Sequence, residues 1–238
     1  MHTNWITRIS KAKKLAKRAA EVAVAGNHNM LMIGPPGAGK TMIAKRIPTI
    51  LPPLTKEESM ELTKLYSIVG GLNANQPLIL ERPFREVHHT ATKSALIGGG
   101  LIPRPGEISL ADKGVLFLDE IAEFQKPVLE MLRQPLEEHF IKIIRNRGVY
   151  HFPAEFLLVA AMNPCPCGNY PDLNKCLCTS TQIQAYLSKI SQPLLDRIDI
   201  CVEAERVAYE DLQGAREESS KGYPRACDHG KRTAKGTV

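Results

Sequence analysis

The sequence predicts an α/β protein in which helices cover both faces of a parallel sheet. Four short apolar runs have the length and composition of buried strands. They are residues 30–33, 115–118, 156–161 and 198–202. Three longer segments begin or end at the signals of a helix terminus. They are residues 11–25, 41–51 and 126–139. This alternation, without an internal repeat, is typical of a three-layer αβα fold.

Composition limits the class of protein. With 238 residues, 43% of them hydrophobic, the chain is long enough for one substantial core and a small second module. No apolar run approaches the roughly 20 residues that cross a bilayer, and the N-terminus lacks the apolar core of a signal peptide. Six cysteines in a chain of this size are not typical of a disulfide framework. We therefore expect a protein of the reducing cytoplasm with no membrane partner.

The net charge of +6 arises at the two ends of the chain. The first 18 residues carry six basic and no acidic side chains, and the tail from Gly214 carries six basic against three acidic. The remainder is slightly acidic. Because solvated basic ends are common, the overall charge is weak evidence for nucleic-acid binding.

The strongest motif is GPPGAGKT, between the first predicted strand and the helix that follows it. Its glycines let successive backbone N–H groups turn inward and surround phosphate oxygens, as in a P-loop. The lysine would reach the β- and γ-phosphates, and the threonine hydroxyl would ligate Mg²⁺. We therefore predict that ATP and Mg²⁺ bind here. The residues concerned are Gly34, Pro35, Pro36, Gly37, Ala38, Gly39, Lys40 and Thr41.

Two acidic residues and an amide follow later strands. Asp119 and Glu120 come directly after the run 115–118, at the sheet edge where parallel sheets bind ligands. Asp119 would join the Mg²⁺ shell, and Glu120 would deprotonate the attacking water. Asn163 follows the run 156–161 and would orient the same water. In isolation the acids could simply cap a helix, and Asn-Pro could be an ordinary turn.

Arg197 lies in the segment LLDRID. An arginine supplied to the γ-phosphate of a neighbouring subunit would neutralise charge in the transition state. The alternative is a surface ion pair with Asp196 or Asp199.

Six cysteines include a cluster with metal-ligand spacing. Cys165, Cys167, Cys176 and Cys178 form two C-x-C pairs, and four thiolates suit tetrahedral Zn²⁺. The spacing within each pair is one residue shorter than in a common zinc knuckle, so four reduced thiols in an ordered loop remain the alternative. The neighbouring His88 and His89 would point to opposite faces of a strand, so we do not expect them to share an ion.

Seven segments together resemble the AAA+ module of the magnesium-chelatase-like ComM/YifB family, which is related to the magnesium chelatase motor subunit and, more distantly, to MCM helicases. The resemblance covers about residues 17–211. The segments are GNHNMLMIGPPGAGKT, ILPPLTKEE, RPFREVHHT, GGGLIPRPGEISLADKGVLFLDE, LRQPLEE, AAMNPCPCG and PLLDRIDI. The resemblance implies the roles given above for Glu120 and Asn163, a trans-acting Arg197, and the cysteine cluster.

The resemblance also implies a hexameric ring of self-associated subunits. It places an insertion in the second helix, at about residues 89–112, and a pre-sensor hairpin at about 140–152, both facing the central pore. Lys142, Arg145 and Arg147 lie near the hairpin tip and could follow the phosphate backbone of DNA. The alternative is a solvated hairpin whose charges prevent edge-to-edge pairing.

The chain departs from the family at both ends. The family carries a large domain before the ATPase core and a helical lid after it, whereas here we expect the core at residues 1–213 and a disordered tail at 214–238 without a lid. The abrupt change near Lys221 suggests a broken reading frame. Two interpretations therefore compete: an ATPase module of a DNA branch-migration or helicase-type motor, and a truncated remnant that binds nucleotide without productive hydrolysis. A magnesium-chelatase-type motor subunit is a third.

Overall fold

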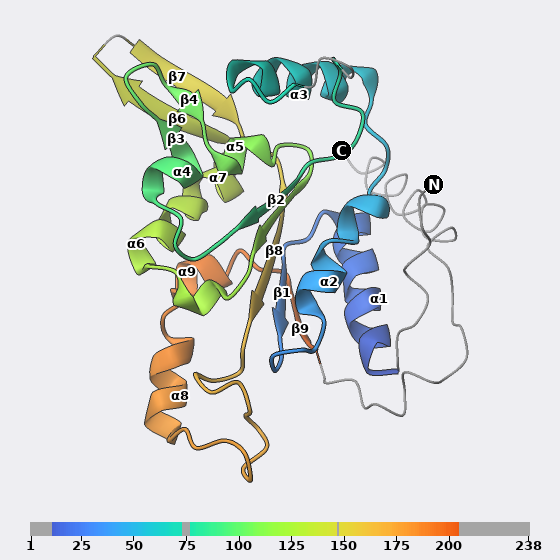
Figure 1. Ribbon diagram of the computed structural model, residues 1–238, viewed down its shortest axis with the longest axis vertical. Coiled ribbons are helices and arrows are strands. Elements are labelled where there is room, and N and C mark those ends of the chain that lie inside the picture. Colours follow the sequence, from blue (N-terminus) through green and yellow to red (C-terminus); the bar gives the residue numbers. More distant parts are fainter. Residues whose placement is uncertain (1–10, 73–76, 147, 205–238) are drawn as a thin grey trace, which may run out of the picture. The chain divides into compact units, whose positions relative to one another are not determined.

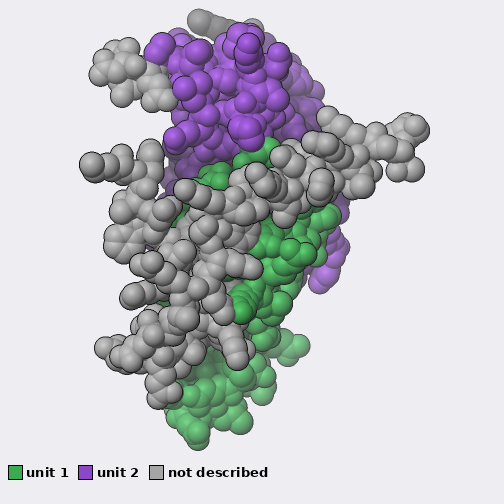
Figure 2. All heavy atoms as spheres, turned by 90° about the vertical axis from the view of Figure 1, so that its right-hand side faces the viewer, with its two compact units in different colours: residues 1–52, 160–189, 198–238 green, residues 53–159, 190–197 purple. Residues whose placement is uncertain are grey.

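The computed structural model describes residues 11–72, 77–146 and 148–204 (Figure 1). The chain divides into two compact units, coloured in Figure 2. Unit 1 comprises residues 1–52, 160–189 and 198–238, and unit 2 comprises residues 53–159 and 190–197. Arg147 and the predicted tail at 214–238 lie outside the described residues, as does the position of the suspected frameshift.

The main sheet has five strands in the order β2-β5-β8-β1-β9. Their bounds are β1 Met30–Ile33, β2 Phe84–Val87, β5 Val115–Leu118, β8 Leu157–Met162 and β9 Ile200–Glu203. The pairs β1–β9 and β2–β5 are parallel. β8 belongs to unit 2 through residue 159 and to unit 1 from residue 160. The α/β fold with a parallel sheet, the P-loop NTPase fold, is confirmed.

In unit 1, β1 lies beside α1 (Lys11–Gly26), which also contacts β9. One face of α1 is buried through small side chains spaced three or four residues apart, as expected for an amphipathic helix. They are Ala16, Ala20, Ala23 and Val24. The unit is completed by the second part of β8 and by α8 (Ser180–Leu187), which begins with a capping box at Thr179 and Gln182.

The helix expected over residues 41–51 is wrong in its length. The structure has α2 (Lys40–Ala44), a turn, and the 3₁₀ helix η1 (Ile47–Thr49). Pro48 stands four residues after Ala44, so it offers no N–H to that carbonyl and its ring would collide with it. The α-helix therefore ends at Ala44.

Unit 2 contains β2, β5 and the first part of β8, with helices that sequence reasoning only partly anticipated. They include α3 (Lys56–Ile68), α4 (Lys93–Ile97), α5 (Glu107–Leu110), η2 (Ile121–Glu123) and α9 (Gln192–Leu195). α3 was not predicted, although Thr55 and Glu58 form a capping box at its start. α4 and α5 fall in the expected insertion, where β3 (Gly98–Gly99) and β4 (Arg104–Pro105) form a short antiparallel pair.

The segment expected as one helix over residues 126–139 is interrupted. It consists of α6 (Lys126–Leu129), η3 (Glu130–Leu132) and α7 (Arg133–Glu138). Pro135 is placed to collide with the carbonyl of Met131 in a continuous α-helix, which accounts for the tighter 3₁₀ turn at that point. His139 ends α7 in the left-handed conformation at φ 58°.

The predicted hairpin is present. β6 (Phe140–Arg145) pairs antiparallel with β7 (Gly148–Pro153), with Phe140 opposite Pro153 and Arg145 opposite Gly148. Among the described residues, no helix is both long and apolar enough to cross a membrane.

One buried carboxyl of unit 2 affects stability. Asp112 follows α5 and is 1% exposed. Its Oδ1 accepts a hydrogen bond of 2.8 Å from the Glu155 backbone N–H, whereas its Oδ2 is buried without a hydrogen-bond partner in the described part of the chain. Burial raises the pKa of Asp112 to about 6. Because the folded state then binds the proton more tightly than the unfolded state, this group favours folding at low pH, and its contribution is lost as pH rises from about 4 to about 6.

We predict that Asp112→Asn removes this pH dependence while keeping an acceptor for the Glu155 N–H. Between pH 4 and pH 7.5 the stability of the variant relative to the wild type should rise by roughly 2–3 kcal/mol. Urea unfolding of both proteins across this range measures the difference, with the exposed Glu57→Gln as the control. Parallel stability profiles for Asp112→Asn and wild type would contradict the assignment.

Candidate active site

The P-loop of unit 1 leaves β1 through a glycine that has no room for a side chain. The Gly34 N–H donates to the Met162 carbonyl at 3.1 Å, and a Cβ on Gly34 would lie 2.0 Å from the Ala204 carbonyl oxygen at the end of β9. Gly37 and Gly39 both have φ of 80°, a conformation that favours glycine. The glycines of the motif therefore serve the turn and the close approach of β9.

Lys40 connects this loop to Asn163. The side chain is only 8% exposed, and its Nζ donates to the Gly34 carbonyl at 2.6 Å, the Pro35 carbonyl at 3.1 Å and Asn163 Oδ1 at 3.2 Å. Asn163 directly follows β8, so the strand order brings together two residues that are far apart in the chain. The structure thus places two of the predicted catalytic residues in contact.

Thr41 follows Lys40 in the first turn of α2 and is partly buried. A buried ammonium and glycine backbone N–H groups can donate hydrogen bonds to phosphate oxygens, and the oxygen of the adjacent hydroxyl can ligate Mg²⁺. The residues present therefore fit a nucleotide phosphate with its metal ion.

A pocket of 810 Å³ adjoins the same loop within unit 1. Its size is in the range of small-molecule and cofactor sites. It shares Gly34 and Pro35 with the P-loop, and its remaining walls come from the loop after β8, from α8 and from the end of β9. Among the lining residues are Tyr170, Pro171, Ile183, Leu187 and Glu203.

In unit 2, the predicted acidic pair directly follows β5. Glu120 adopts a left-handed conformation, at φ 53° and ψ 47°, which a non-glycine residue occupies at a cost of about 1–2 kcal/mol. Its N–H donates to Asp119 Oδ1 at 3.0 Å. The side chain of Glu120 is about half exposed. The turn therefore presents this carboxylate to solvent while its backbone is fixed by Asp119.

His89 lies beside Glu120, which sequence reasoning did not anticipate. Its Nδ1 is 3.6 Å from Glu120 Oε2 and is buried without a hydrogen-bond partner among the described residues. The assumption that His88 and His89 lie on a strand is wrong, because β2 ends at Val87 and the two rings are 4.1 Å apart. Nothing local in the sequence could have signalled the contact, since it depends on β2 and β5 being neighbours.

Arg197 follows α9 and forms an ion pair with Glu137 of α7. The surface pair that we considered with Asp196 or Asp199 is thus made with a different acid. Asp196 instead accepts from Gln192, and Asp199 accepts from the Asn29 N–H. Arg197 is 40% exposed.

The described hairpin residues Lys142 and Arg145 are both exposed. Lys142 lies opposite His151, and the Arg145 guanidinium lies 3.2 Å from the position of a Cβ on Gly99 in β3. The hairpin and the insertion of unit 2 are therefore neighbours at this point.

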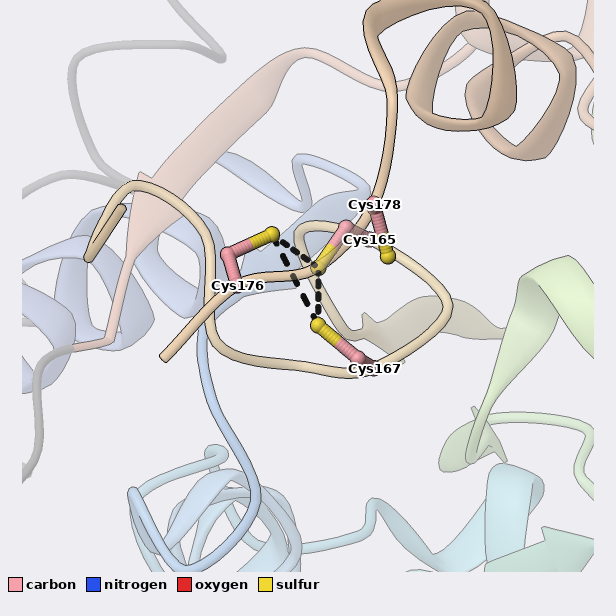
Figure 3. A group of neighbouring side chains, drawn as sticks. All are labelled: Cys165, Cys167, Cys176 and Cys178. Atoms are coloured by element: carbon pink, nitrogen blue, oxygen red, sulfur yellow. Dashed lines mark hydrogen bonds between the residues drawn. The ribbon is translucent and has the colours of Figure 1, made fainter. Parts of the chain in front are cut away.

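The four clustered cysteines of unit 1 converge (Figure 3). Their sulfur atoms all lie within 4.8 Å of one another. The three separations among Cys165, Cys167 and Cys176 are 3.4, 3.8 and 3.6 Å. Four thiolates around one Zn²⁺ at about 2.3 Å would have their sulfurs about 3.8 Å apart. The cluster therefore fits a tetrahedral metal ion despite its short C-x-C spacing.

Among these thiols the pKa of Cys167 is lowered to about 6, chiefly by a hydrogen bond from the Asn169 backbone and also by the Cys165 side chain. A thiolate is the form that ligates metal. Cys201 lies on β9, outside the cluster.

Comparison with known proteins agrees with this geometry. Residues 8–212 match the family described as magnesium chelatase, subunit ChlI. The chain belongs to this family. It is 49% identical to YifB from Salmonella typhimurium over 187 residues, which cover 79% of this chain and 37% of that protein. It is 48% identical to the competence protein ComM from Haemophilus influenzae over 207 residues, 86% of this chain and 40% of ComM.

The chain is thus a ComM/YifB-type AAA+ module that spans about two fifths of the length of these relatives. Among solved structures, NtrX from Brucella abortus in complex with ATP matches with a TM-score of 0.53 at 17% sequence identity. That match covers 85% of this chain and 39% of NtrX. At this identity the likeness shows the fold, in agreement with the observed sheet.

We predict that Gly34→Ala and Gly37→Ala differ in their effect on stability. A Cβ at Gly34 collides with the Ala204 backbone, which cannot yield without moving β9, so the loss should exceed about 2 kcal/mol. A Cβ at Gly37 meets nothing within 4 Å, so only the left-handed backbone is penalised, by about 1 kcal/mol. Chemical denaturation compares the two variants, and equal losses would contradict the close approach of β9.

Proposed function

We propose that this chain is the ATP-binding and ATP-hydrolysing module of a ring-forming motor that acts on DNA. The observation that carries the proposal is the contact of buried Lys40 with Asn163 at the P-loop. This contact unites the residue that would bind the γ-phosphate with the residue that would orient the attacking water.

Nucleotide binding follows from the partners of Lys40. Its ammonium now donates to two P-loop carbonyls, and phosphate oxygens are stronger acceptors for the same group. Thr41 and Asp119 are the residues we assign to Mg²⁺, which would neutralise charge on the β- and γ-phosphates. The adjoining pocket of 810 Å³ offers space and apolar walls for the nucleoside.

Hydrolysis requires a base and a means of fixing it. Glu120 presents a half-exposed carboxylate on a turn of defined backbone conformation, and we assign it as the general base. His89 lies close enough to limit where that carboxylate can point. We assign His89 as a positioning residue rather than a catalytic one.

We assign Arg197 as the residue that one copy of the chain would supply to the γ-phosphate bound by a neighbouring copy. Its present partner, Glu137, is an exposed acid, and an exposed ion pair contributes only about 0–1 kcal/mol. A γ-phosphate at a subunit interface could therefore take the guanidinium from Glu137 at little cost, and this supports a ring in which each site is completed by a neighbour.

The exposed side chains of unit 2 support DNA as the proposed substrate. Lys142 and Arg145 provide exposed cations on a hairpin that lies beside the insertion. Exposed apolar side chains occur on the same two elements, with Ile144 64% and Leu101 91% exposed. Cations that contact phosphates beside apolar groups that can contact bases are the combination found in nucleic-acid-binding proteins.

We predict that Glu120→Gln separates binding from hydrolysis. Binding is measured as the dissociation constant of a fluorescent ATP analogue with Mg²⁺, and hydrolysis is measured as the rate of phosphate release. Glu120→Gln should keep the affinity and lower the rate by about 100-fold, the usual contribution of a general base. Lys40→Ala should lower both the nucleotide affinity and the hydrolysis rate.

His89→Ala belongs in the same experiment. It should lower the hydrolysis rate and leave nucleotide affinity unchanged, whereas Thr90→Ala, at the next exposed position, should change neither. Wild-type hydrolysis that does not depend on Glu120, or no detectable nucleotide binding, would contradict the proposed function.

We predict that Lys142→Ala combined with Arg145→Ala weakens binding to single-stranded DNA. If both side chains contact phosphates, the slope of log affinity against log salt concentration should fall by about 1.4. Anisotropy of a labelled oligonucleotide over a range of salt measures this slope. The pair Lys56→Ala and Lys64→Ala removes two exposed charges from α3 and is the matched control. An unchanged slope on the hairpin would remove the case for DNA there.

A further inference from the structure

The loop that carries the cysteine cluster packs against the proposed nucleotide site within unit 1. Asn163 and Cys165 are separated by a single residue, and Gly168 in the turn that follows packs against Pro36 of the P-loop. We propose that the cluster binds Zn²⁺ and that the bound metal holds the P-loop and Asn163 in place, so that metal occupancy sets nucleotide affinity. The inference rests on the proposed binding of nucleotide at Lys40.

The segment between Asn163 and α8 has little besides the cluster to order it. Residues 163–179 contain no helix or strand, and Leu173 and Leu177 are 81% and 91% exposed. Its buried positions are Cys165, Gly168 and Cys176, two of which are cluster members. Fixing a residue's backbone costs about 1–2 kcal/mol, so a segment of this length needs a compensating interaction. Four metal–thiolate bonds would supply it.

Hydrogen bonds within the segment support a ligand role for Cys165. The Gly168 N–H donates to the Cys165 carbonyl at 3.0 Å and closes a turn. The Tyr170 N–H points at Cys165 Sγ from 3.4 Å. Hydrogen bonds to a ligating sulfur stabilise its thiolate and fix its direction.

Gly168, in the loop that carries the cluster, is where this loop meets the proposed nucleotide site. A Cβ on Gly168 would lie 2.7 Å from Pro36 Cδ and 3.0 Å from Pro36 Cγ, in the P-loop. It would lie 3.9 Å from Asn163 Cγ. The turn that carries Cys165 and Cys167 therefore packs against both the loop and the residue that hydrogen-bonds Lys40.

Because a packed contact transmits displacement, release of the metal would free this turn to move away from Pro36 and Asn163. Lys40 would then lose an ordered partner, and the P-loop would have to be ordered again by the nucleotide. Lower affinity is the expected result.

The test uses the full chain purified without chelator. Metal content is measured by elemental analysis, and affinity by titration with a fluorescent ATP analogue in the presence of Mg²⁺. We expect one zinc per chain, an approximately tenfold loss of affinity after removal with a zinc-selective chelator, and recovery when Zn²⁺ is added back. Circular dichroism follows the fold during removal.

Two glycine variants separate metal binding from the contact. Gly168 and Gly70 have similar φ angles of 77° and 71°, but a Cβ on Gly70 meets nothing within 4 Å. Gly168→Ala should retain zinc and bind nucleotide more weakly, whereas Gly70→Ala should retain both properties. Cys178→Ser should lose both zinc and affinity.

The possible failures are distinguishable. Protein without stoichiometric zinc, even after incubation with Zn²⁺, would overturn the metal site. Unchanged affinity after zinc removal, or in Gly168→Ala, would overturn the coupling while leaving nucleotide binding intact. Zinc-loaded protein that binds no nucleotide would instead overturn the proposed function on which the inference depends.

Discussion

The buried ammonium of Lys40 is the interaction on which unit 1 depends. A charge that is only 8% exposed must be hydrogen-bonded, or its desolvation would be severely unfavourable. Gly34, Pro35 and Asn163 meet this requirement with oxygen atoms from the first two residues of the P-loop and from the residue that directly follows β8. The same requirement makes the site responsive, because a phosphate can replace carbonyls as an acceptor without exposing the charge.

Much of this arrangement could be predicted from sequence, because it is encoded locally. β1 and β5 match the apolar runs residue for residue, since buried parallel strands are continuous apolar segments bounded by turn residues. The P-loop, the acids after β5 and the hairpin could also be predicted from the sequence. Each depends on residue types within a short window, and family resemblance fixed their order.

The remainder depends on contacts between distant segments. β2 has the sequence FREV, in which two of four residues are charged, and it becomes a strand because β5 pairs with it. The proximity of His89 to Glu120 follows from that pairing and has no local signal. The predicted helices over residues 41–51 and 126–139 were extended across Pro48 and Pro135. Proline has no N–H to donate to the carbonyl four residues earlier, and applying this rule would have shortened both predicted helices.

The chain order after β8 gives the strongest reason to treat the cysteines and the P-loop as one system. Asn163 directly follows the strand, Cys165 follows two residues later, and Gly168 returns to Pro36. A displacement of the cysteine turn therefore has only a few bonds over which to relax before it reaches Lys40. Glu120, Arg197 and the hairpin belong to unit 2, whereas the cysteine segment, Lys40 and Asn163 belong to unit 1. Changes in the cysteine segment should consequently affect nucleotide binding first, and hydrolysis only as a result of it.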